Sequence, residues 1–363
     1  MWALVRPDAI KVLHDEKARK GYRRYFDVMG DRKLAKFTIA RKIPAFFAEN
    51  ASLENLWSLH KKLTEEFYQL EKKADEKEIN VNDLSLSEKS YLDLKSKLAD
   101  RIVSNCHLCE RRCNVNRFSG KLGYCRCGPQ ILVSSMFEHL GEEPEITPSF
   151  TIFTMGCNLT CRHCQNWTIS QWFEAGSPAT APSLARAIDR FRKAGCRNAN
   201  LVGGDPVPWT HQWLEVFKHV GTNVPVFWNT NGYYSEETAK LLAGFVDIYK
   251  IDFKYGNNDC ATRISNAPRF WEVCTRNLLY AKKYGDLLIR VLVLPGHLDC
   301  CLKPILHWIA KNLGPETRTN IMWQYRPEYK ANEIPELRRS LTHEEMKLSL
   351  EIAKEAGLLN YIT

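Results

Sequence analysis

The chain has 363 residues, a net charge of +9 and 13 cysteines. This length allows one large domain or two ordinary ones with a substantial buried core. No window of the sequence approaches the roughly 18 uninterrupted apolar residues of a membrane span. The first residues, "MWALVRPDAIKVLHDEK", lack the cationic start and long apolar stretch of a secretory signal. We therefore expect a cytoplasmic protein without a membrane span.

The positive charge is concentrated near the N-terminus. Residues 1–50 hold 12 Lys and Arg against 6 Asp and Glu. Such a segment could meet RNA, an acidic protein or an anionic membrane surface. It could equally be a solvated surface.

Two helices are expected after this basic segment. Apolar residues recur at helical spacing over 52–73 and again over 94–102. Ser85 and Glu88 form a candidate capping box for the second helix. The pair would form a helical hairpin that packs on a larger domain. Residues 1–104 are thus expected to form a basic, mostly helical N-terminal extension.

Eight of the 13 cysteines lie in two clusters, at 106–127 and 157–164. In a chain without an export signal, such clustering favours metal binding over disulfides. We expect residues 105–147 to form a small cysteine-rich metal-binding segment. The other five cysteines have no ligand spacing and are expected to be buried thiols or surface residues: Cys196, Cys260, Cys274, Cys300 and Cys301.

The first cluster lies in "CHLCERRCNVNRFSGKLGYCRCG". Its candidate ligands are Cys106, Cys109, Cys113 and Cys125, with Cys127 as a possible substitute for the fourth. Four thiolates could bind structural zinc or an auxiliary iron–sulfur cluster, and both alternatives stay open. The neighbouring arginines could balance thiolate charge or form an RNA-binding knuckle.

From residue 148 onward, segments rich in Val, Ile and Leu alternate with amphipathic segments. The expected strands are 150–155, 198–204, 224–230, 246–253, 286–295 and 319–325. The expected helices are 183–195, 210–221, 235–245, 269–284, 301–313 and 342–357. Six such repeats indicate an α/β fold with parallel strands joined by right-handed crossovers. Ligands should gather at the carboxyl ends of these strands.

The second cysteine cluster, in "MGCNLTCRHCQNW", follows the first of these strands. Cys157, Cys161 and Cys164 form C-x3-C-x2-C. Structural zinc and ordinary iron–sulfur clusters each need four protein ligands. Three thiolates around a cubane would leave one iron open to another ligand. A zinc site that borrows His163 is the alternative.

This pattern, placed after the first strand of a six-fold β/α repeat, resembles the radical S-adenosylmethionine (SAM) superfamily. The resemblance implies a partial (β/α)6 barrel over 148–363 and a [4Fe–4S] cluster held by the three cysteines, with SAM on its open iron. It further implies an external one-electron reductant of the ferredoxin or flavodoxin type. Reductive cleavage of SAM in this family yields a 5′-deoxyadenosyl radical, which abstracts hydrogen from the substrate while the protein binds and orients the reactants.

Two further segments carry the resemblance. "GGDP", at 203–206, resembles the family's G-G-E-P motif, so Gly203, Gly204 and Asp205 are expected to help hold SAM. Glycine suits a backbone that must approach a ligand closely. His163 occupies an often aromatic position before the last cluster cysteine, where it could lie near the adenine.

"NTNGY" and "IDFKY" resemble segments of the pyruvate formate-lyase activating enzyme branch, which brings Asn229 and Asp252 into the expected cofactor site. That branch has a carboxylate where Asn229 stands and a methionine where Lys250 stands, around a monovalent cation. The exchange suggests that the Lys250 ammonium replaces the cation, unless Lys250 points outward into a helix layer. Arg290 could reach the SAM carboxylate or ribose, or it could pair with an acid across the sheet.

A closer resemblance over residues 105–357 rests on "HLGEEP", "CQNW", "VDIYKIDFKY" and "RVLVLPGHL". These segments look like uncharacterised relatives of the activating enzyme, including the radical SAM member of the AmmeMemoRadiSam group. A partial barrel with a lateral opening favours hydrogen abstraction from a protein or other macromolecule. One alternative is a radical SAM enzyme that modifies RNA or a small metabolite. Another is a non-enzymatic cysteine-rich module that binds metal or nucleic acid.

Overall fold

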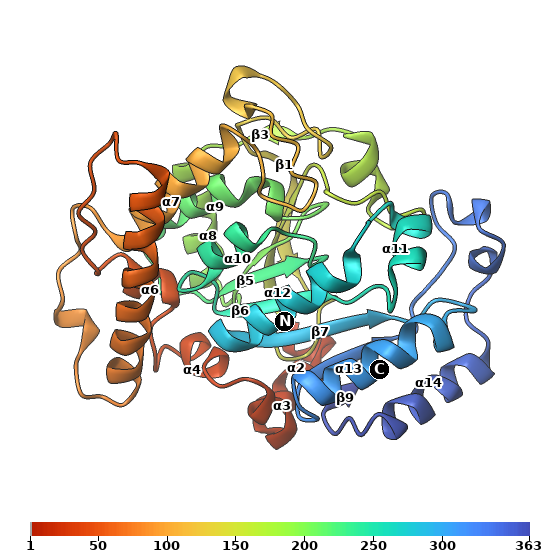
Figure 1. The fold of residues 1–363 in the computed structure, drawn as a ribbon. Coiled ribbons are helices and arrows are strands. Elements are labelled where there is room, and N and C mark those ends of the chain that lie inside the picture. The colour runs from red at the N-terminus through yellow and green to blue at the C-terminus, as the bar shows by residue number, and fades with distance from the viewer. Residues whose placement is uncertain (1) are drawn as a thin grey trace.

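The computed structural model describes residues 2–363, apart from the side chain of Asn82. A single nine-stranded sheet forms its centre, in the order β3-β1-β2-β4-β5-β6-β7-β8-β9 (Figure 1). The strands are β1 Leu132–His139, β2 Ser149–Thr154, β3 Ser177–Pro178, β4 Ala199–Leu201, β5 Val226–Thr230, β6 Ile248–Asp252, β7 Asp286–Leu292, β8 Arg318–Met322 and β9 Tyr361–Ile362. The order is linear, with β3 and β9 at its edges, so the sheet does not close into a full barrel.

Helices follow each of the strands β2 and β4 to β8, which confirms the six predicted strand–helix repeats. The helices of this part are α8 Ala181–Lys193, α9 Thr210–His219, α10 Glu236–Leu242, α11 Asn258–Ser265, α12 Phe270–Tyr284, α13 Lys303–Asn312 and α14 His343–Glu355. Each strand in the run β2-β4-β5-β6-β7-β8 pairs in parallel with its neighbour. Helix α11 was not predicted from the sequence. Strand β1 falls within the segment 105–147 and pairs with β2 in antiparallel.

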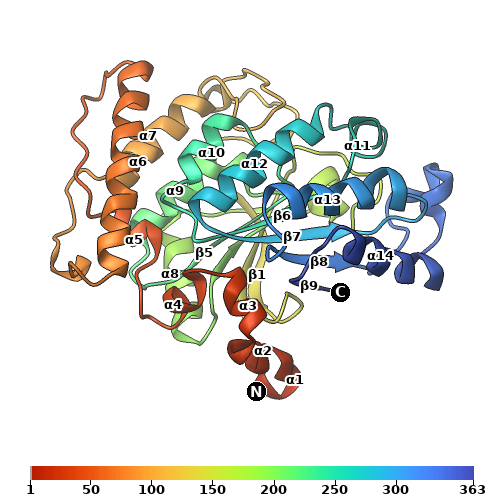
Figure 2. The same cartoon turned by 60° about the horizontal axis from the view of Figure 1, so that its bottom comes forward.

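The N-terminal part contains α1 Trp2–Val5, α2 Pro7–Lys11, α3 Glu16–Gly21, α4 Tyr25–Met29, α5 Lys36–Ala40, α6 Leu53–Asp75 and α7 Tyr91–Val103. Helices α6 and α7 lie side by side at one flank, as predicted (Figures 1 and 2). The predicted capping box was wrong, because Ser85 is exposed and lies outside the helix. Ser90 and Asp93 form the capping box instead: each side chain accepts a hydrogen bond from the backbone N–H of the other.

Residues of α3 and α4 close the barrel at the amino ends of its strands. Tyr22, Tyr25 and Phe26 pack with Phe227, Ile248 and Leu288, which face the barrel interior. The Asp286 carboxylate, at the start of β7, accepts hydrogen bonds from three consecutive backbone N–H groups of the segment 23–25 at 2.7–2.8 Å. This part of the basic extension is therefore built into the barrel floor.

A layer of charged side chains lies above this apolar floor. The loop between β1 and β2 places Glu142 and Glu143 inside the barrel, where both accept hydrogen bonds from the Arg290 guanidinium at 2.5–2.6 Å. Glu145 pairs with Arg318 of β8 through Nε at 2.7 Å. All three glutamates are buried, so the ion pairs compensate for the loss of hydration.

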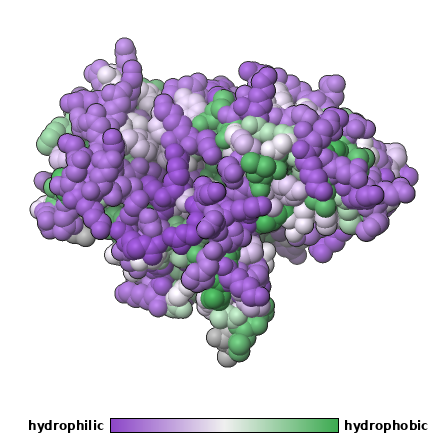
Figure 3. Space-filling view, turned by 90° about the horizontal axis from the view of Figure 1, so that it is seen from below, coloured by the Kyte–Doolittle hydropathy of each residue, from purple (hydrophilic) through white to green (hydrophobic). Residues whose placement is uncertain are grey.

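Helices α1 and α2 project from the lower side of the molecule (Figures 2 and 3). Leu4 and Val5 are 88% and 66% exposed and lie in this projection, which is hydrophobic near its tip (Figure 3). Within residues 2–363, no helix has both the length and the apolar character needed to span a bilayer.

Candidate active site

The three-cysteine loop starts where β2 ends. Cys157 and Cys161 are buried and Cys164 is partly buried. The backbone N–H groups of Thr160 and Arg162 donate to carbonyls near the end of α11, at 3.2 and 2.9 Å. The loop is therefore held against α11 and is not free to move independently.

Several polar groups point at the three sulfurs. Asn231 Nδ2 donates to Cys157 Sγ at 3.5 Å, and the backbone N–H of Leu159 donates to the same sulfur at 3.4 Å. Ser170 Oγ lies 3.2 Å from Cys164 Sγ. Burial raises the pKa of Cys161, and the opposing effect of the Lys254 ammonium only partly offsets this. Such donors and a nearby cation favour the thiolate form that metal ligation requires.

The sulfur spacing does not fit a single zinc ion. Zn–S bonds of about 2.3 Å in a tetrahedron place two sulfurs about 3.8 Å apart. Throughout the described part of the chain, Cys157, Cys161 and Cys164 do not form a set within 4.8 Å of one another. A wider set suits a cluster in which each cysteine binds a different iron. The buried sulfurs and their donors therefore fit the cluster better than the zinc alternative.

The glycine turn after β4 packs directly on this loop. Gly203 has φ of +95°, and a Cβ there would lie 2.1 Å from Thr154 Oγ1; at Gly204, a Cβ would lie 2.3 Å from the Gly156 carbonyl oxygen. The Asp205 carboxylate accepts hydrogen bonds from Thr230 Oγ1 and from the N–H of Asn231, at 3.0 and 2.8 Å. Asp205 thus links the ends of β4 and β5.

Four predicted cofactor residues lie side by side on the barrel interior. The register aligns Asn229 with Lys250 and Asp252 with Arg290. Lys250 therefore faces the interior and not the helix layer. Burial and Arg290 lower the pKa of Lys250 to about 8, against the opposing effect of Glu142 and other acids.

Two lysines bracket Asp252. Burial raises the pKa of Asp252, but Lys254, Lys250 and Arg290 outweigh it and hold the pKa at about 2. Lys254 Nζ donates to Asp252 Oδ2 at 2.9 Å. Arg290, by contrast, is engaged by Glu142 and Glu143, so the acid pairing considered for it is observed. The role of each of these residues toward SAM stays a prediction.

His163 is buried beside the loop. Burial, and then Lys254, lower the pKa of His163 to about 3, so the imidazole is neutral. His163 Nε2 lies 3.2 Å from the Tyr255 hydroxyl, and the ring lies edge-on to Tyr325 at 6.0 Å. Near β8, Asn320 donates to Glu143 at 2.8 Å, and Gln324 is exposed.

The cysteine-rich segment covers the end of β5 near the same loop. Burial and then its cysteine neighbours raise the pKa of Cys109. Those neighbours are Cys125, Cys106 and Cys113, so the four predicted ligands lie together. A hydrogen bond from Cys127 lowers the pKa of Cys125 to about 6. Cys127 itself lies where this segment meets the loop, since its sulfur would be 2.3 Å from a Cβ at Gly156.

Residues 151–309, from β2 to within α13, match the profile of the radical SAM superfamily. This span holds the three-cysteine loop and the glycine turn just described. The chain belongs to the radical SAM superfamily. Membership implies a [4Fe–4S] cluster and SAM as cofactors, and a source of reducing electrons.

Two proteins of Methanocaldococcus jannaschii are similar in sequence to this radical SAM enzyme, and both are uncharacterised. MJ0674 is 41% identical over 340 residues, which cover 92% of this chain and 97% of that protein. MJ0808 is 26% identical over 285 residues, which cover 72% and 81%. The crystal structure of Streptococcus suis SuiB bound to precursor peptide SuiA aligns with 12% identity and a TM-score of 0.42, covering 56% of this chain and 46% of SuiB. SuiB bound to SAM aligns with 13% identity and a TM-score of 0.39, covering 57% and 48%.

Three residues of the radical SAM site were not singled out from the sequence: Asn231, Lys254 and Tyr255. Asn231 lies inside the segment "NTNGY", and Lys254 and Tyr255 lie inside "IDFKY", so their position at strand ends could have identified all three. The place of Tyr255 between His163 and Cys161 follows from packing alone.

Proposed function

We propose that this radical SAM enzyme belongs to the activating-enzyme-like branch and removes a hydrogen atom from a macromolecular substrate, in the first instance a protein. One observation carries the proposal: the sheet does not close between its β3 and β9 edges, and an exposed aromatic surface lies on β1 and β2, next to the β3 edge. Phe137 is 41% exposed and stacks on Phe153 at 5.7 Å. Phe137 pairs with Thr151, whose hydroxyl accepts from the interior side chain Asn200. Exposed aromatic surface of this kind is typical of recognition sites.

Cys157, Cys161 and Cys164 would hold the cluster, and the turn at 203–205 would meet SAM. Once bound, cluster and SAM supply a 5′-deoxyadenosyl radical. The chain's own residues prepare the site. Lys254 offsets the negative charge of the thiolates, and the buried neutral His163 helps to exclude water. Lys250 provides a buried cation in the interior beside Asn229, consistent with a role in place of a monovalent metal ion.

For the cysteine-rich segment, we infer an auxiliary iron–sulfur cluster in preference to zinc. Among the described residues, Cys106, Cys109, Cys113 and Cys125 do not form a set within 4.8 Å of one another, which is wider than a zinc tetrahedron. Iron analysis of anaerobically purified protein tests this inference. About eight irons per chain would support two cubanes. About four irons, together with zinc that is lost when Cys109 is changed to Ser, would contradict it.

The RNA alternative has weaker support, because many basic residues are already engaged. Arg24 pairs with Asp75 at 2.7 Å, and Lys36 pairs with Glu71 at 2.5 Å. In the cysteine-rich segment, Arg117 is buried. These cations therefore serve intramolecular contacts and do not form a free surface for phosphates.

The proposed chemistry is tested by reconstituting the protein anaerobically, reducing it and measuring 5′-deoxyadenosine formed from SAM. Wild-type protein should produce 5′-deoxyadenosine, and Cys161→Ala should produce none. Cys196→Ala is the matched control because Cys196 is buried away from the loop, in the turn that follows α8. Absence of SAM cleavage with an intact cluster in wild-type protein would contradict the proposal.

The substrate class is tested by adding fractions of the native cell extract to the same assay. A protein substrate predicts that the fraction above about 10 kDa increases 5′-deoxyadenosine and that protease treatment abolishes the increase. Phe137→Ala should weaken this stimulation while leaving SAM cleavage without extract unchanged. An increase that passes a small-molecule filter, or that ribonuclease removes, would overturn the protein assignment.

A further inference from the structure

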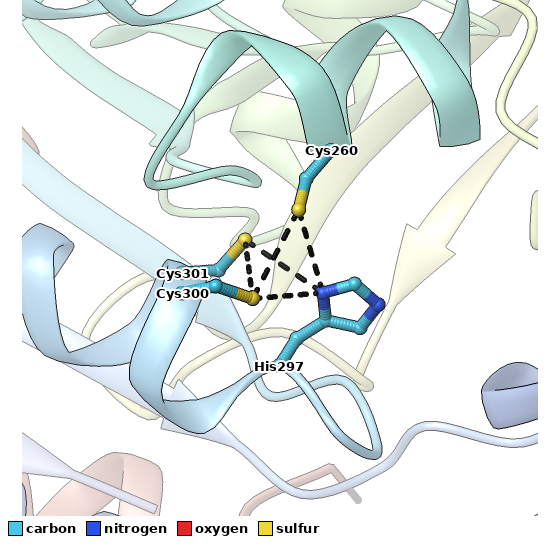
Figure 4. Close-up of side chains that lie close together, drawn as sticks. All are labelled: Cys260, His297, Cys300 and Cys301. Carbon is cyan, nitrogen blue, oxygen red and sulfur yellow. Dashed lines mark hydrogen bonds between the residues drawn. The ribbon is translucent and has the colours of Figure 1, made fainter.

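A second group of metal-ligating side chains lies outside the site just described. Cys260 of α11 and the residues His297, Cys300 and Cys301 after β7 point toward a common centre (Figure 4). We call these four residues the four-ligand cluster. From the sequence, its three cysteines were expected to be buried thiols or surface residues, because they have no ligand spacing. The fold brings together positions 37 and 40 residues apart, a proximity that spacing along the chain does not show.

The distances within the four-ligand cluster match one tetrahedral ion. His297 Nδ1 lies 3.2, 3.6 and 4.0 Å from the sulfurs of Cys300, Cys260 and Cys301, in that order. Cys300 Sγ lies 3.9 Å from each of the other two sulfurs. For Zn–S bonds of about 2.3 Å and a Zn–N bond of about 2.0 Å, a tetrahedron predicts edges of about 3.8 Å between sulfurs and about 3.5 Å between nitrogen and sulfur.

The local backbone produces this arrangement. Residues Leu298–Leu302 form a π-helical turn, in which the N–H groups of Cys301 and Leu302 both donate to the His297 carbonyl at 3.0 and 3.1 Å. Such turns recur at functional sites because they place side chains where a regular helix would not. Here the turn directs one imidazole and two thiols to the same side.

Two residues bring the loop before α11 onto this turn. A Cβ at Gly256 would lie 2.6 Å from the Cys301 carbonyl oxygen, so the close approach requires glycine. Asn257 donates to the Cys300 carbonyl at 2.8 Å, and its side-chain oxygen accepts from the Cys260 N–H at 2.8 Å. The side chain of Asn257 thus fixes Cys260 relative to Cys300.

The surroundings also resemble those of a metal site. His297 Nε2 is buried and lies 3.3 Å from Glu336 Oε1. Metal-bound histidines commonly present their outer nitrogen to a carboxylate in this way. Cys260, His297 and Cys301 are buried, whereas Cys300 is exposed and would provide the entry path for an ion.

We propose that the four-ligand cluster binds one zinc-class divalent ion, with three thiolates and the His297 imidazole as its complete coordination shell. Four protein ligands leave no open position, so the ion is structural and not catalytic. It joins α11, which follows β6, to the turn after β7. Because the backbone of the Cys157–Cys164 loop hydrogen-bonds to α11, the ion also fixes the helix that supports the radical SAM cluster.

Alkylation of Cys300 tests this site in the wild-type protein. The exposed thiol should react slowly with iodoacetamide when the ion is bound and at least tenfold faster after a zinc chelator is added, as followed by peptide mass spectrometry. An equal rate before and after chelation would overturn the proposal. So would a native disulfide between Cys300 and either Cys260 or Cys301 in freshly isolated protein.

Metal content provides an independent measurement. Protein produced with added zinc should contain one more zinc per chain than the variants Cys300→Ser and His297→Gln, whatever metal the segment 105–147 holds. Cys274→Ser is the matched control, because Cys274 is buried in α12 outside the cluster. Cys300 is exposed, so Cys300→Ser is expected to fold, which circular dichroism can verify. An unchanged zinc content in folded Cys300→Ser would contradict the assignment.

Discussion

At the scale of single residues, the glycine turn after β4 is the most constrained part of the radical SAM site. Gly203 combines a positive φ with backbone contact to Thr154, so two separate reasons exclude a side chain. Gly195 has a similar φ of +105°, yet a Cβ there would meet nothing within 4 Å. A comparison of substitutions at the two positions therefore separates the cost of a positive φ from the cost of a steric collision.

We predict that Gly203→Ala destabilises the protein more than Gly195→Ala does. Strain from the positive φ should cost about 1–2 kcal/mol at both positions. The collision with Thr154 should add about 1–3 kcal/mol at Gly203 alone. Denaturant unfolding measures the difference, and bound iron should fall only in Gly203→Ala because Thr154 leads into the cysteine loop. Equal losses of stability in the two variants would contradict this prediction.

At the scale of elements, α7 shows why helix starts are hard to locate. Ser85 with Glu88 and Ser90 with Asp93 have the same three-residue spacing between hydroxyl and acid. The structure contains the second pair. Ser90 also forms an isolated β-bridge with Pro44, and this contact fixes the backbone where the chain enters the helix. The capping signal was genuine, but the long-range contact decided its position.

Replacing Ser90 with Ala should lower the free energy of unfolding by about 1 kcal/mol, the usual contribution of an N-cap. Ser85→Ala removes the same hydroxyl from an exposed position and should change it by less than about 0.5 kcal/mol. Chemical denaturation of both variants is the measurement. A larger loss in Ser85→Ala would show that the helix starts earlier than the structure indicates.

At the scale of the whole molecule, the barrel interior is built from distant segments in layers. Aromatic residues of the N-terminal extension close its floor, and Glu142 and Glu143 from the β1–β2 loop reach Arg290 above them. Burial raises the pKa of Glu142 and Glu143, but Arg290 and Lys250 together outweigh it and hold both values below the usual range. These ion pairs connect the loop to β7.

We predict that Arg290→Leu lowers the free energy of unfolding by about 3–5 kcal/mol near neutral pH, because it leaves two buried carboxylates without their partner. A depressed carboxyl pKa stabilises the fold above the unfolded-state value and loses this effect as the pH falls. The difference from wild type should therefore be largest above about pH 5 and shrink below about pH 4. Arg186→Leu, on the exposed side of α8, is the control. A difference that stays constant from about pH 3 to 7 would contradict the assignment.

Much of this molecule could be predicted from local patterns. The alternation of strands and helices gave all six repeats, and the spacing of Cys157, Cys161 and Cys164 located the radical SAM loop. Shorter elements were missed. The strand β9 has two residues and α11 has eight, too few for a period to stand out from chance.

The sequence by itself therefore determined the fold class and located the three-cysteine loop for which we propose the cluster, because both depend on residues close together along the chain. Only the tertiary structure decided which residues far apart in the sequence come into contact. Arg290 finds Glu143 from 147 residues away, and Cys260 meets His297 from 37 residues away. Such contacts follow from the order in which the strands pair in the sheet and from the packing of the loops at their ends. No local period or spacing encodes that packing, so the charged barrel interior and the four-ligand cluster became visible only in three dimensions.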